Sequence, residues 1–367
     1  MHSQPIKFMM ALAASLLLTA RLAHADATNL PPAREMHLYT IDGELTFADD
    51  TTTYVVGYST WDDNLGPAPE PLTDEIKQKL SKRLTVPGPT LRMKKGEHVR
   101  VIMHNAGHIL CSEHSAFHNV PHTIHFHGLD LIQPMDGVPD LPLPPVTEGK
   151  SYAYDFTPDF EGTYMYHCHV DAASHIILGM YGALIVDGDE PKTIYGYHYD
   201  REYTLVLSEM DTKHNEAMRE KGRYDLLKWH TDYYLLNGRI FVSDLKNPLS
   251  TINDPKSRLV CNVGDTVLLR FLAVGMNHTF AMHPHGFHFE VIGTDGRRLP
   301  YMYEKDTLPM CSGERYDVLV KVGPKHKGLC TSCNIGKGIS IMHDHNLIGE
   351  ASDGTYPKGP LTIFEVQ

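Results

Sequence analysis

Short stretches in which apolar and polar residues alternate, separated by turns rich in glycine and proline, run along most of the chain. In 96–101 (GEHVRV) and 264–269 (GDTVLL), a turn glycine is followed by this strand-type alternation. Helical periodicity is confined to two charged segments: 74–83 (DEIKQKLSKR), which predicts a surface helix, and 212–227, a second helical candidate. The pattern therefore predicts an all-β fold made of antiparallel β-sandwiches.

One set of landmarks occurs twice, in the same order and at similar spacing, which indicates an internal repeat. The landmarks of the two copies are His-x-His-Gly at 125–128 and 283–286, a strand ending in His-x-His at 162–169 and 338–345, and a closing apolar strand at 183–186 and 361–364. Two domains of one kind are therefore expected, at 26–190 and 191–367, with the boundary near 190–200. Residues 26–35 are expected to form a loose N-terminal arm.

The first 25 residues have the pattern of a secretory signal peptide. Lys7 precedes a 13-residue apolar run at 8–20, and Ala23-His24-Ala25 offers an A-x-A cleavage site. The run is shorter than the roughly 20 residues of a transmembrane helix, so an uncleaved membrane anchor is disfavoured. We expect cleavage near Ala25 and a periplasmic or secreted mature protein without a membrane anchor.

Composition narrows the function. The length of 367 residues suits two domains of about 150 residues each. The net charge of -12 argues against a nucleic-acid partner, which would need a basic face. The unusual feature is the presence of 24 histidines, many of them in His-x-His pairs, which makes metal binding the first hypothesis.

Four His-x-His pairs occupy equivalent positions in the two repeats. Residues i and i+2 of a strand point to the same face, so each pair presents two imidazoles together. Imidazole suits copper, zinc, nickel and iron. The eight residues are His125, His127, His167, His169, His283, His285, His343 and His345.

A second metal site is predicted on the opposite face of the strand that ends in His167-Cys168-His169. Cys168 points away from its two neighbours, and His122 lies at an odd offset from His125 that reverses its face. His175 and Met180 follow Cys168. Two His, one Cys and a weak Met are the ligands of a blue copper electron-transfer centre.

The second repeat has lost this blue site. Asp344 stands in the position of Cys168, and Phe280 stands in the position of His122. The sequence therefore predicts one blue copper, in the first domain.

These motifs resemble those of multicopper oxidases, and most closely the two-domain type with its type 1 copper in the N-terminal domain. The resemblance implies two cupredoxin-like Greek-key β-sandwich domains and a homotrimer. It also implies a trinuclear copper cluster between domain 1 of one subunit and domain 2 of the next. Each chain would hold four coppers: one type 1, one type 2 and two type 3.

The resemblance also assigns roles to individual residues. His125 and His283 would hold the type 2 copper, and Asp136 would relay protons to oxygen, although a turn aspartate before Gly137 is an equal alternative. Asp171 is a weaker relay candidate. The type 3 coppers would be held by His127, His167, His169, His285, His343 and His345.

The implied reaction is a one-electron oxidation of a small reducing substrate, phenol-like or a metal ion, coupled to reduction of the co-substrate dioxygen to water. Two alternatives remain. A copper nitrite reductase would need an aspartate where His125 stands and has no use for His169. A non-catalytic copper-binding or electron-transfer protein would leave the paired imidazoles unexplained.

Three features depart from the family pattern or stay open. Six residues separate Cys168 from His175, where the family often has four. The segment 104–118, with His or Cys at five positions, fits a polar surface loop better than an accessory metal site. The pairing of the other cysteines cannot be deduced, and Cys330-x2-Cys333 suits a loop disulfide or plain loop cysteines better than a zinc or redox half-motif. Those cysteines are Cys111, Cys261, Cys311, Cys330 and Cys333.

Overall fold

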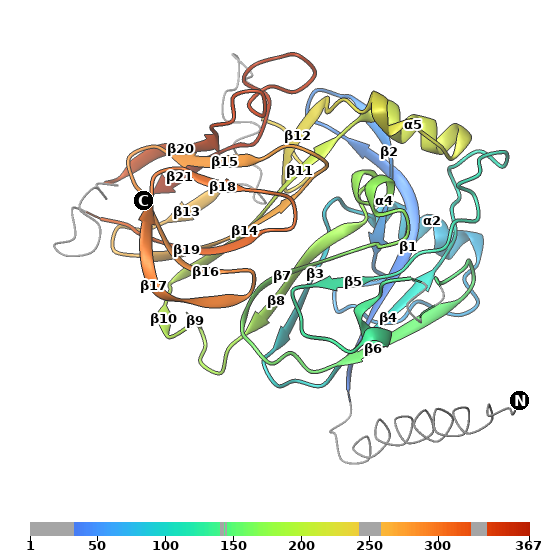
Figure 1. Ribbon diagram of the computed structural model, residues 1–367, viewed down its shortest axis with the longest axis horizontal. Helices are drawn as coiled ribbons and strands as arrows, with labels where there is room; N and C mark the ends of the chain where they lie inside the picture. Colours follow the sequence, from blue (N-terminus) through green and yellow to red (C-terminus); the bar gives the residue numbers. More distant parts are fainter. Residues whose placement is uncertain (1–32, 140–142, 144, 242–257, 324–335) are drawn as a thin grey trace, which may run out of the picture.

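The computed structural model describes residues 33–139, 143, 145–241, 258–323 and 336–367, which form two β-rich halves in sequence order (Figure 1). The predicted signal segment 1–25 and Cys330 and Cys333 lie outside the described residues. Each half is a sandwich of two sheets with its own buried core. The prediction of an all-β fold with two β-sandwiches is confirmed.

The first half consists of two four-stranded sheets, with strand orders β2-β1-β4-β6 and β3-β8-β7-β5. Alternate residues of β4 face the core, so Val99, Val101 and Met103 are fully buried, which is the period-two pattern of a half-buried strand. The strands are β1 Arg34–Thr46, β2 Thr52–Ser59, β3 Gly88–Lys94, β4 Val99–Asn105, β5 His125–His127, β6 Ser151–Phe156, β7 Gly162–His167 and β8 Tyr181–Asp187.

The second half has sheets of six and five strands, ordered β12-β11-β14-β19-β16-β17 and β13-β21-β20-β15-β18. A two-stranded ribbon, β9 Thr193–Ile194 with β10 Tyr197–His198, precedes it. Its strands are β11 Arg201–Met210, β12 Tyr233–Leu236, β13 Leu259–Cys261, β14 Thr266–Val274, β15 Phe280–Pro284, β16 Phe289–Thr294, β17 Arg297–Lys305, β18 Leu308–Met310, β19 Arg315–Lys321, β20 Gly338–Asp344 and β21 Leu361–Val366.

The sheets are not purely antiparallel as the sequence pattern suggested. In each half the first strand pairs in parallel with a later one: β1 with β4, and β11 with β14. Strands β3 and β8, and β13 and β21, are also parallel. Alternation of apolar residues reports which face of a strand is buried but not the direction of its neighbour, so the sequence could not distinguish these pairs.

The two predicted helices are present. Helix α2 spans Asp74–Arg83 as expected, with the Thr73 side chain accepting a hydrogen bond from the amide of Ile76. The segment 212–227 forms α5 Thr212–Lys221, which ends at Gly222 with φ 65°, followed by the 3-10 turn η1 Leu226–Lys228. Two short helices were not anticipated: α3 Gln133–Asp136 and α4 Ala172–Leu178.

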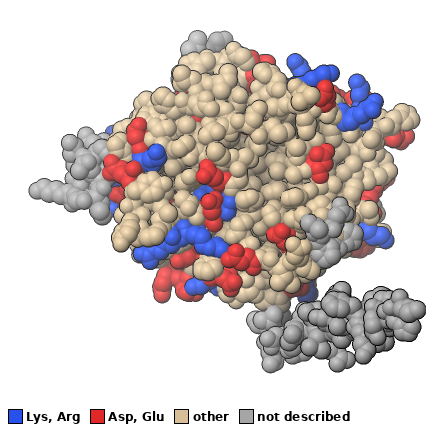
Figure 2. All heavy atoms as spheres, in the orientation of Figure 1, with Lys and Arg blue, Asp and Glu red and all other residues tan. Residues whose placement is uncertain are grey.

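The prediction of a loose arm at 26–35 is wrong for its last two residues, because Arg34 and Glu35 already belong to β1 and pair with β4. Within the described ranges, no helix is long and apolar enough to cross a membrane. Figure 2 shows acidic and basic side chains interspersed around broad uncharged areas on one face. On that face the negative net charge is not gathered into a single patch.

Helix α5 follows the expected boundary near 190–200 in the chain, yet it packs on the first half beside β2 (Figure 1). The carbonyl of Arg219 accepts from the amide of Ser112, and the Asn215 side-chain amide donates to the carbonyl of Tyr54. The chain passes from the sheets of the first half to those of the second near residue 190, but α5, which comes after that point, still contacts the first half. Part of the second half therefore covers the upper end of the first sandwich.

Candidate metal centres

The predicted blue-copper ligands meet at one buried point of the first half. Cys168 follows β7 directly, His175 lies in α4, and His122 forms an isolated bridge with Val146. The Cys168 Sγ atom is 3.2 Å from His175 Nδ1 and 3.8 Å from His122 Nδ1. All three side chains are at most 1% exposed. Both imidazoles therefore point the same nitrogen, Nδ1, at the sulfur.

The six-residue spacing between Cys168 and His175 is explained by α4. This single helix begins after Asp171, which has φ 42°, and ends at Gly179 with φ 117°. The chain then returns so that the Cys168 amide donates to the Met180 carbonyl, 3.0 Å away. The Met180 side chain is fully buried in the same core cluster as Cys168. The longer spacing thus inserts a helix while keeping all four predicted residues together.

Burial sets the protonation of this trio. It raises the pKa of the Cys168 thiol to about 11 and lowers the pKa of His175 to about 4. Burial also places the pKa of His122 well below its usual value. Without metal the site is an uncharged thiol with two neutral imidazoles, and a metal cation would favour the thiolate. The donor set of one soft sulfur and two imidazole nitrogens fits copper.

The first His quartet gathers where β5 ends beside β7. In the β5–β7 register His125 pairs with His167, and the neighbouring rings of the quartet lie 5.1–5.9 Å apart. His125 donates from Nδ1 to the Asp136 carbonyl at 2.7 Å, and His167 donates from Nδ1 to the Cys168 carbonyl at 2.9 Å. Because a carbonyl only accepts, both rings keep their Nε2 lone pairs free for a metal.

His127 is held differently from its neighbours. The Nη1 atom of Arg315, a buried residue of the second half, lies 2.9 Å from His127 Nδ1. A guanidinium only donates, so this Nδ1 accepts and the neutral ring carries its proton on Nε2. Burial, followed by the charge of Arg315, lowers the pKa of His127 to about 4. Metal binding at His127 therefore requires the ring to release either Arg315 or its Nε2 proton.

The second quartet gathers between β15 and β20. Its neighbouring rings lie 5.0–5.7 Å apart, and the Nε2 atoms of His285 and His343 face each other at 3.0 Å. His343 Nδ1 lies 3.1 Å from the Asp344 carbonyl and also contacts the Glu350 carboxylate. This repeats the His167–Cys168 arrangement, so the same backbone device orients a ring in both repeats. In the single chain His285 and His345 are exposed.

The two quartets are separate within one chain. Every ring contact that involves these eight histidines joins members of the same quartet, as far as the described residues show. One chain thus carries two half-sites on different sandwiches.

The two proton-relay candidates lie in different places. The Asp136 carboxylate is 3.3 Å from His125 Nδ1 and its side chain is 30% exposed, which places it between solvent and the first quartet. Asp171 is exposed. Its negative charge raises the pKa of His175, which opposes the effect of burial, and it raises the pKa of Cys168, which adds to the effect of burial. Asp171 therefore lies on the blue-site side of the strand.

The position of the lost blue site in the second half is filled by a polar network. Asp344 accepts from the amide of Ala281 at 2.7 Å and pairs with His278 Nε2 at 2.6 Å. Phe280 is fully buried beside it. Sequence analysis missed His278, because it lies two residues before the position that matches His122.

The segment 104–118 does not form one site. His104 pairs with His37 at 2.9 Å, His108 with His122 at 3.3 Å, and Cys111 Sγ with His118 Nδ1 at 3.4 Å. The surface-loop expectation is wrong for His108 and Cys111, which are both buried, and His108 lies against His122. Among the described cysteines, four are free thiols, and they are Cys111, Cys168, Cys261 and Cys311.

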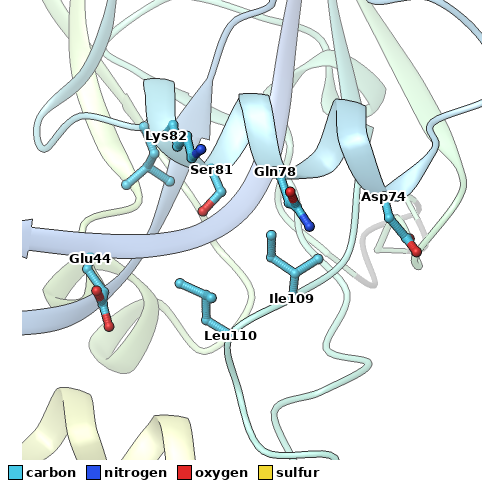
Figure 3. A pocket seen from close by; sticks show the side chains of 8 residues that line it. Glu44, Asp74, Gln78, Ser81, Lys82, Ile109 and Leu110 are labelled. Atoms are coloured by element: carbon cyan, nitrogen blue, oxygen red, sulfur yellow. The ribbon is translucent and has the colours of Figure 1, made fainter.

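A groove of about 680 Å³ opens between α2 and the residues that follow His108. Its wall includes Ile109 and Leu110, whose amides donate to the buried carboxylate of Asp42, each at 2.7 Å. Figure 3 shows Glu44 and Asp74 at opposite ends of the groove. The groove also contains Lys82, and its wall at Ile109 follows directly after His108, whose ring contacts His122.

The chain is similar in sequence to known copper proteins. Copper resistance protein A of Pseudomonas syringae pv. tomato is 26% identical over 304 residues, which cover 73% of this chain and 46% of that protein. The chain spans about half the length, or less, of the curated relatives it matches.

Two solved structures share the fold. The multicopper oxidase mgLAC has a TM-score of 0.68 at 26% identity, covering 92% of this chain and 87% of that one. The blue copper oxidase of Nitrosomonas europaea has a TM-score of 0.68 at 24% identity, covering 91% and 86%.

Two family models, both described as multicopper oxidase, match residues 81–191 and 201–345. The two ranges together make up more than half of the chain, and they contain the blue-site residues and all four His-x-His pairs. The chain therefore belongs to the multicopper oxidase family.

Proposed function

We propose that the protein is an oxidase that takes single electrons from a reducing substrate, phenol-like or a metal ion, and uses four of them to reduce dioxygen to water. The observation that carries this proposal is the sharing of His167-Cys168-His169 between two sites. Cys168 belongs to the buried trio with His122 and His175, while His167 lies in the first quartet. Two metal sites joined through consecutive residues are suited to passing electrons from one to the other.

Copper, when bound, would supply the electron storage and oxygen chemistry that amino acids lack. The chain's own residues would hold it: His122, Cys168, His175 and Met180 for type 1. Burial of these side chains excludes water from the site. As in the family, type 2 copper is assigned to His125 and His283, and the type 3 pair to His127, His167, His169, His285, His343 and His345, giving four coppers per chain.

Asp136 is proposed to deliver protons to the cluster. Its carboxylate is partly exposed and lies 3.3 Å from His125 Nδ1, so it can exchange protons with solvent and hold one beside the first quartet. The position of Asp171 near the blue site makes it the weaker candidate for this role.

A homotrimer is proposed because a single chain presents incomplete sites. Exposed apolar side chains lie on the strand that carries His343 and just after His345: Ile339 at 58%, Leu347 at 65% and Ile348 at 62% exposure. Such patches mark protein interfaces. A cyclic arrangement in which the first quartet of one chain covers the second quartet of the next would bury them and close the ring.

The reducing substrate is proposed to bind in the groove of Figure 3. The blue-site ligands are buried, so an electron has to cross a protein layer, and the groove lies against the segment that follows His108. Asp74 would attract cationic donors, whereas Arg219, 3.6 Å from Glu44, partly balances the charge of Glu44, and Lys82 adds a positive charge to the groove. The segment 1–25 favours a periplasmic or secreted location for this reaction.

The alternatives explain less of the molecule. A nitrite reductase would need an acid where His125 joins the first quartet, and an electron carrier would need the blue trio alone. Oxygen uptake with a reductant, with nitrite turnover as the control, separates the three functions.

The test of the proposed function is Cys168→Ser in the copper-loaded protein. Because the serine hydroxyl cannot replace the thiolate, the intense blue absorption should vanish and oxygen uptake should stop, while the spin-coupled copper pair remains. The wild type should contain about four coppers per chain by family analogy. A variant that stays blue, or a fully loaded wild type with about two coppers and no coupled pair, would contradict the proposal.

A further inference from the structure

The blue site has an additional polar neighbour that the copper-ligand motifs do not include. His108 lies 14 residues before His122, and their Nε2 atoms are 3.3 Å apart. His108 is 5% exposed and His122 is fully buried, so water does not replace this contact. One of the two nitrogens has to donate to the other.

The direction of this hydrogen bond follows from the partners at the opposite ring nitrogens. His108 Nδ1 is 2.9 Å from the carbonyl of Phe117, which only accepts, so His108 carries its proton on Nδ1. With its proton on Nδ1, His108 presents the Nε2 lone pair to His122. His122 therefore donates from Nε2, and its lone pair lies on Nδ1, which faces Cys168.

The position of His108 is fixed by its surroundings. The Phe117 ring stacks on it with centroids 4.9 Å apart and planes 14° apart, and the same Phe117 ring meets His175 edge-on at 5.2 Å. The amide of Gly107 donates to the Asn105 side chain. After His108 the chain is held by the Asp42 carboxylate, which accepts from the amide of Ile109. A packed aromatic layer thus holds His108 against the blue site.

We propose that His108 is a positioning residue of the blue copper site, which locks His122 in the tautomer that binds copper and lowers the reduction potential of the metal. The inference rests on the proposed function only for a copper at the trio of His122, Cys168 and His175. A hydrogen-bond acceptor at Nε2–H makes the opposite nitrogen a stronger donor, as outer partners of metal-bound histidines do. A stronger donor stabilises Cu(II) over Cu(I), so loss of the acceptor raises the potential.

The experiment compares two replacements of His108 in the full-length, copper-loaded protein. His108→Phe keeps a ring to stack on Phe117 but removes the acceptor, while His108→Gln keeps an acceptor oxygen. His114, which is exposed in the same segment, provides the matched control His114→Phe. The readouts are the blue absorption, the electron paramagnetic resonance spectrum and the reduction potential by redox titration, none of which needs oxygen turnover.

We expect His108→Phe to shift the Cu(II)-over-Cu(I) binding ratio roughly tenfold toward Cu(I), which for one electron is about 59 mV. His108→Gln should recover most of this shift, and His114→Phe should show none. An unchanged potential and spectrum in His108→Phe would overturn the proposal. A wild type that binds no blue copper would instead overturn the proposed function.

Should His108→Phe not fold, pulsed electron paramagnetic resonance of the wild type and His108→Gln decides the question. This method reads the remote ring nitrogen of each bound histidine. The Nε2 of His122 should show a hydrogen-bonded coupling distinct from that of His175, and the coupling should change in His108→Gln. Identical couplings for both rings, unaltered in the variant, would overturn the proposal.

Discussion

The metal-free protein should lose stability steeply in mild acid because its blue-site and cluster histidines are buried as neutral rings. Burial lowers the pKa of His167 to about 3 and that of His175 to about 4, from the usual 6.5. Between the folded and unfolded pKa values the unfolded chain binds more protons than the folded chain. The stability that the two neutral rings give the folded protein is therefore fully present above about pH 6.5 and is lost as the pH falls toward 4.

The size of the loss follows from the two shifts. Going from about pH 7 to about pH 5, each of these two histidines removes ~2 kcal/mol from the free energy of unfolding, or ~4 kcal/mol together. Both side chains are nearly fully buried, so solvent screening reduces this little. Against a typical total of about 5–15 kcal/mol, the loss is large enough to measure.

The assay is urea unfolding of the metal-free protein at the two pH values. His167→Gln removes one titrating ring and should reduce the pH-dependent loss by the ~2 kcal/mol assigned to that ring, whatever it does to stability at either pH. The exposed His198 provides the control His198→Gln, which should leave the loss unchanged. A wild-type free energy of unfolding that is the same at both pH values would refute the burial argument.

Three other outcomes are expected. His285→Ala should lower the oxygen-uptake rate at least about 100-fold while the blue absorption persists, since even outer partners of metal ligands cost 10–100-fold; unchanged uptake would contradict the role of the second quartet. Asp42→Ala should reduce the free energy of unfolding by about 3 kcal/mol in a urea titration, because it leaves buried amides without an acceptor; a change below about 1 kcal/mol would show that the carboxylate is dispensable. Combining Glu44→Gln with Asp74→Asn should raise the KM for a cationic donor several-fold without lowering kcat, and an unaffected KM would place donor binding outside the groove.

The grouping of the candidate metal ligands was predictable because its signal is local. The two-residue period of a strand places His125 beside His127, and it turns Cys168 away from His167 and His169. The repeat then doubled that signal. Helix α2 was also visible, because its charged sequence and capping threonine act within a few residues.

Contacts between distant parts of the chain were not predictable from such patterns. Strand alternation did not reveal the parallel pairing of β1 with β4, and nothing near Asp344 in the sequence pointed to His278 as its partner, 66 residues away. The segment 104–118 was misjudged for the same reason. Its polar composition resembles a surface loop, but α5 and the Asp42 carboxylate hold it against the core.

The sequence by itself determined the two repeats and which of the candidate ligand side chains share a face, since strand periodicity and covalent adjacency fix these without reference to the rest of the fold; its motifs carried the family resemblance. Only the tertiary structure decided that the two quartets are separate in one chain, that Arg315 faces His127 across 188 residues, and that His108 holds His122. A tautomer or a ring's orientation depends on the atom at its far nitrogen, and folding alone brings that atom into place.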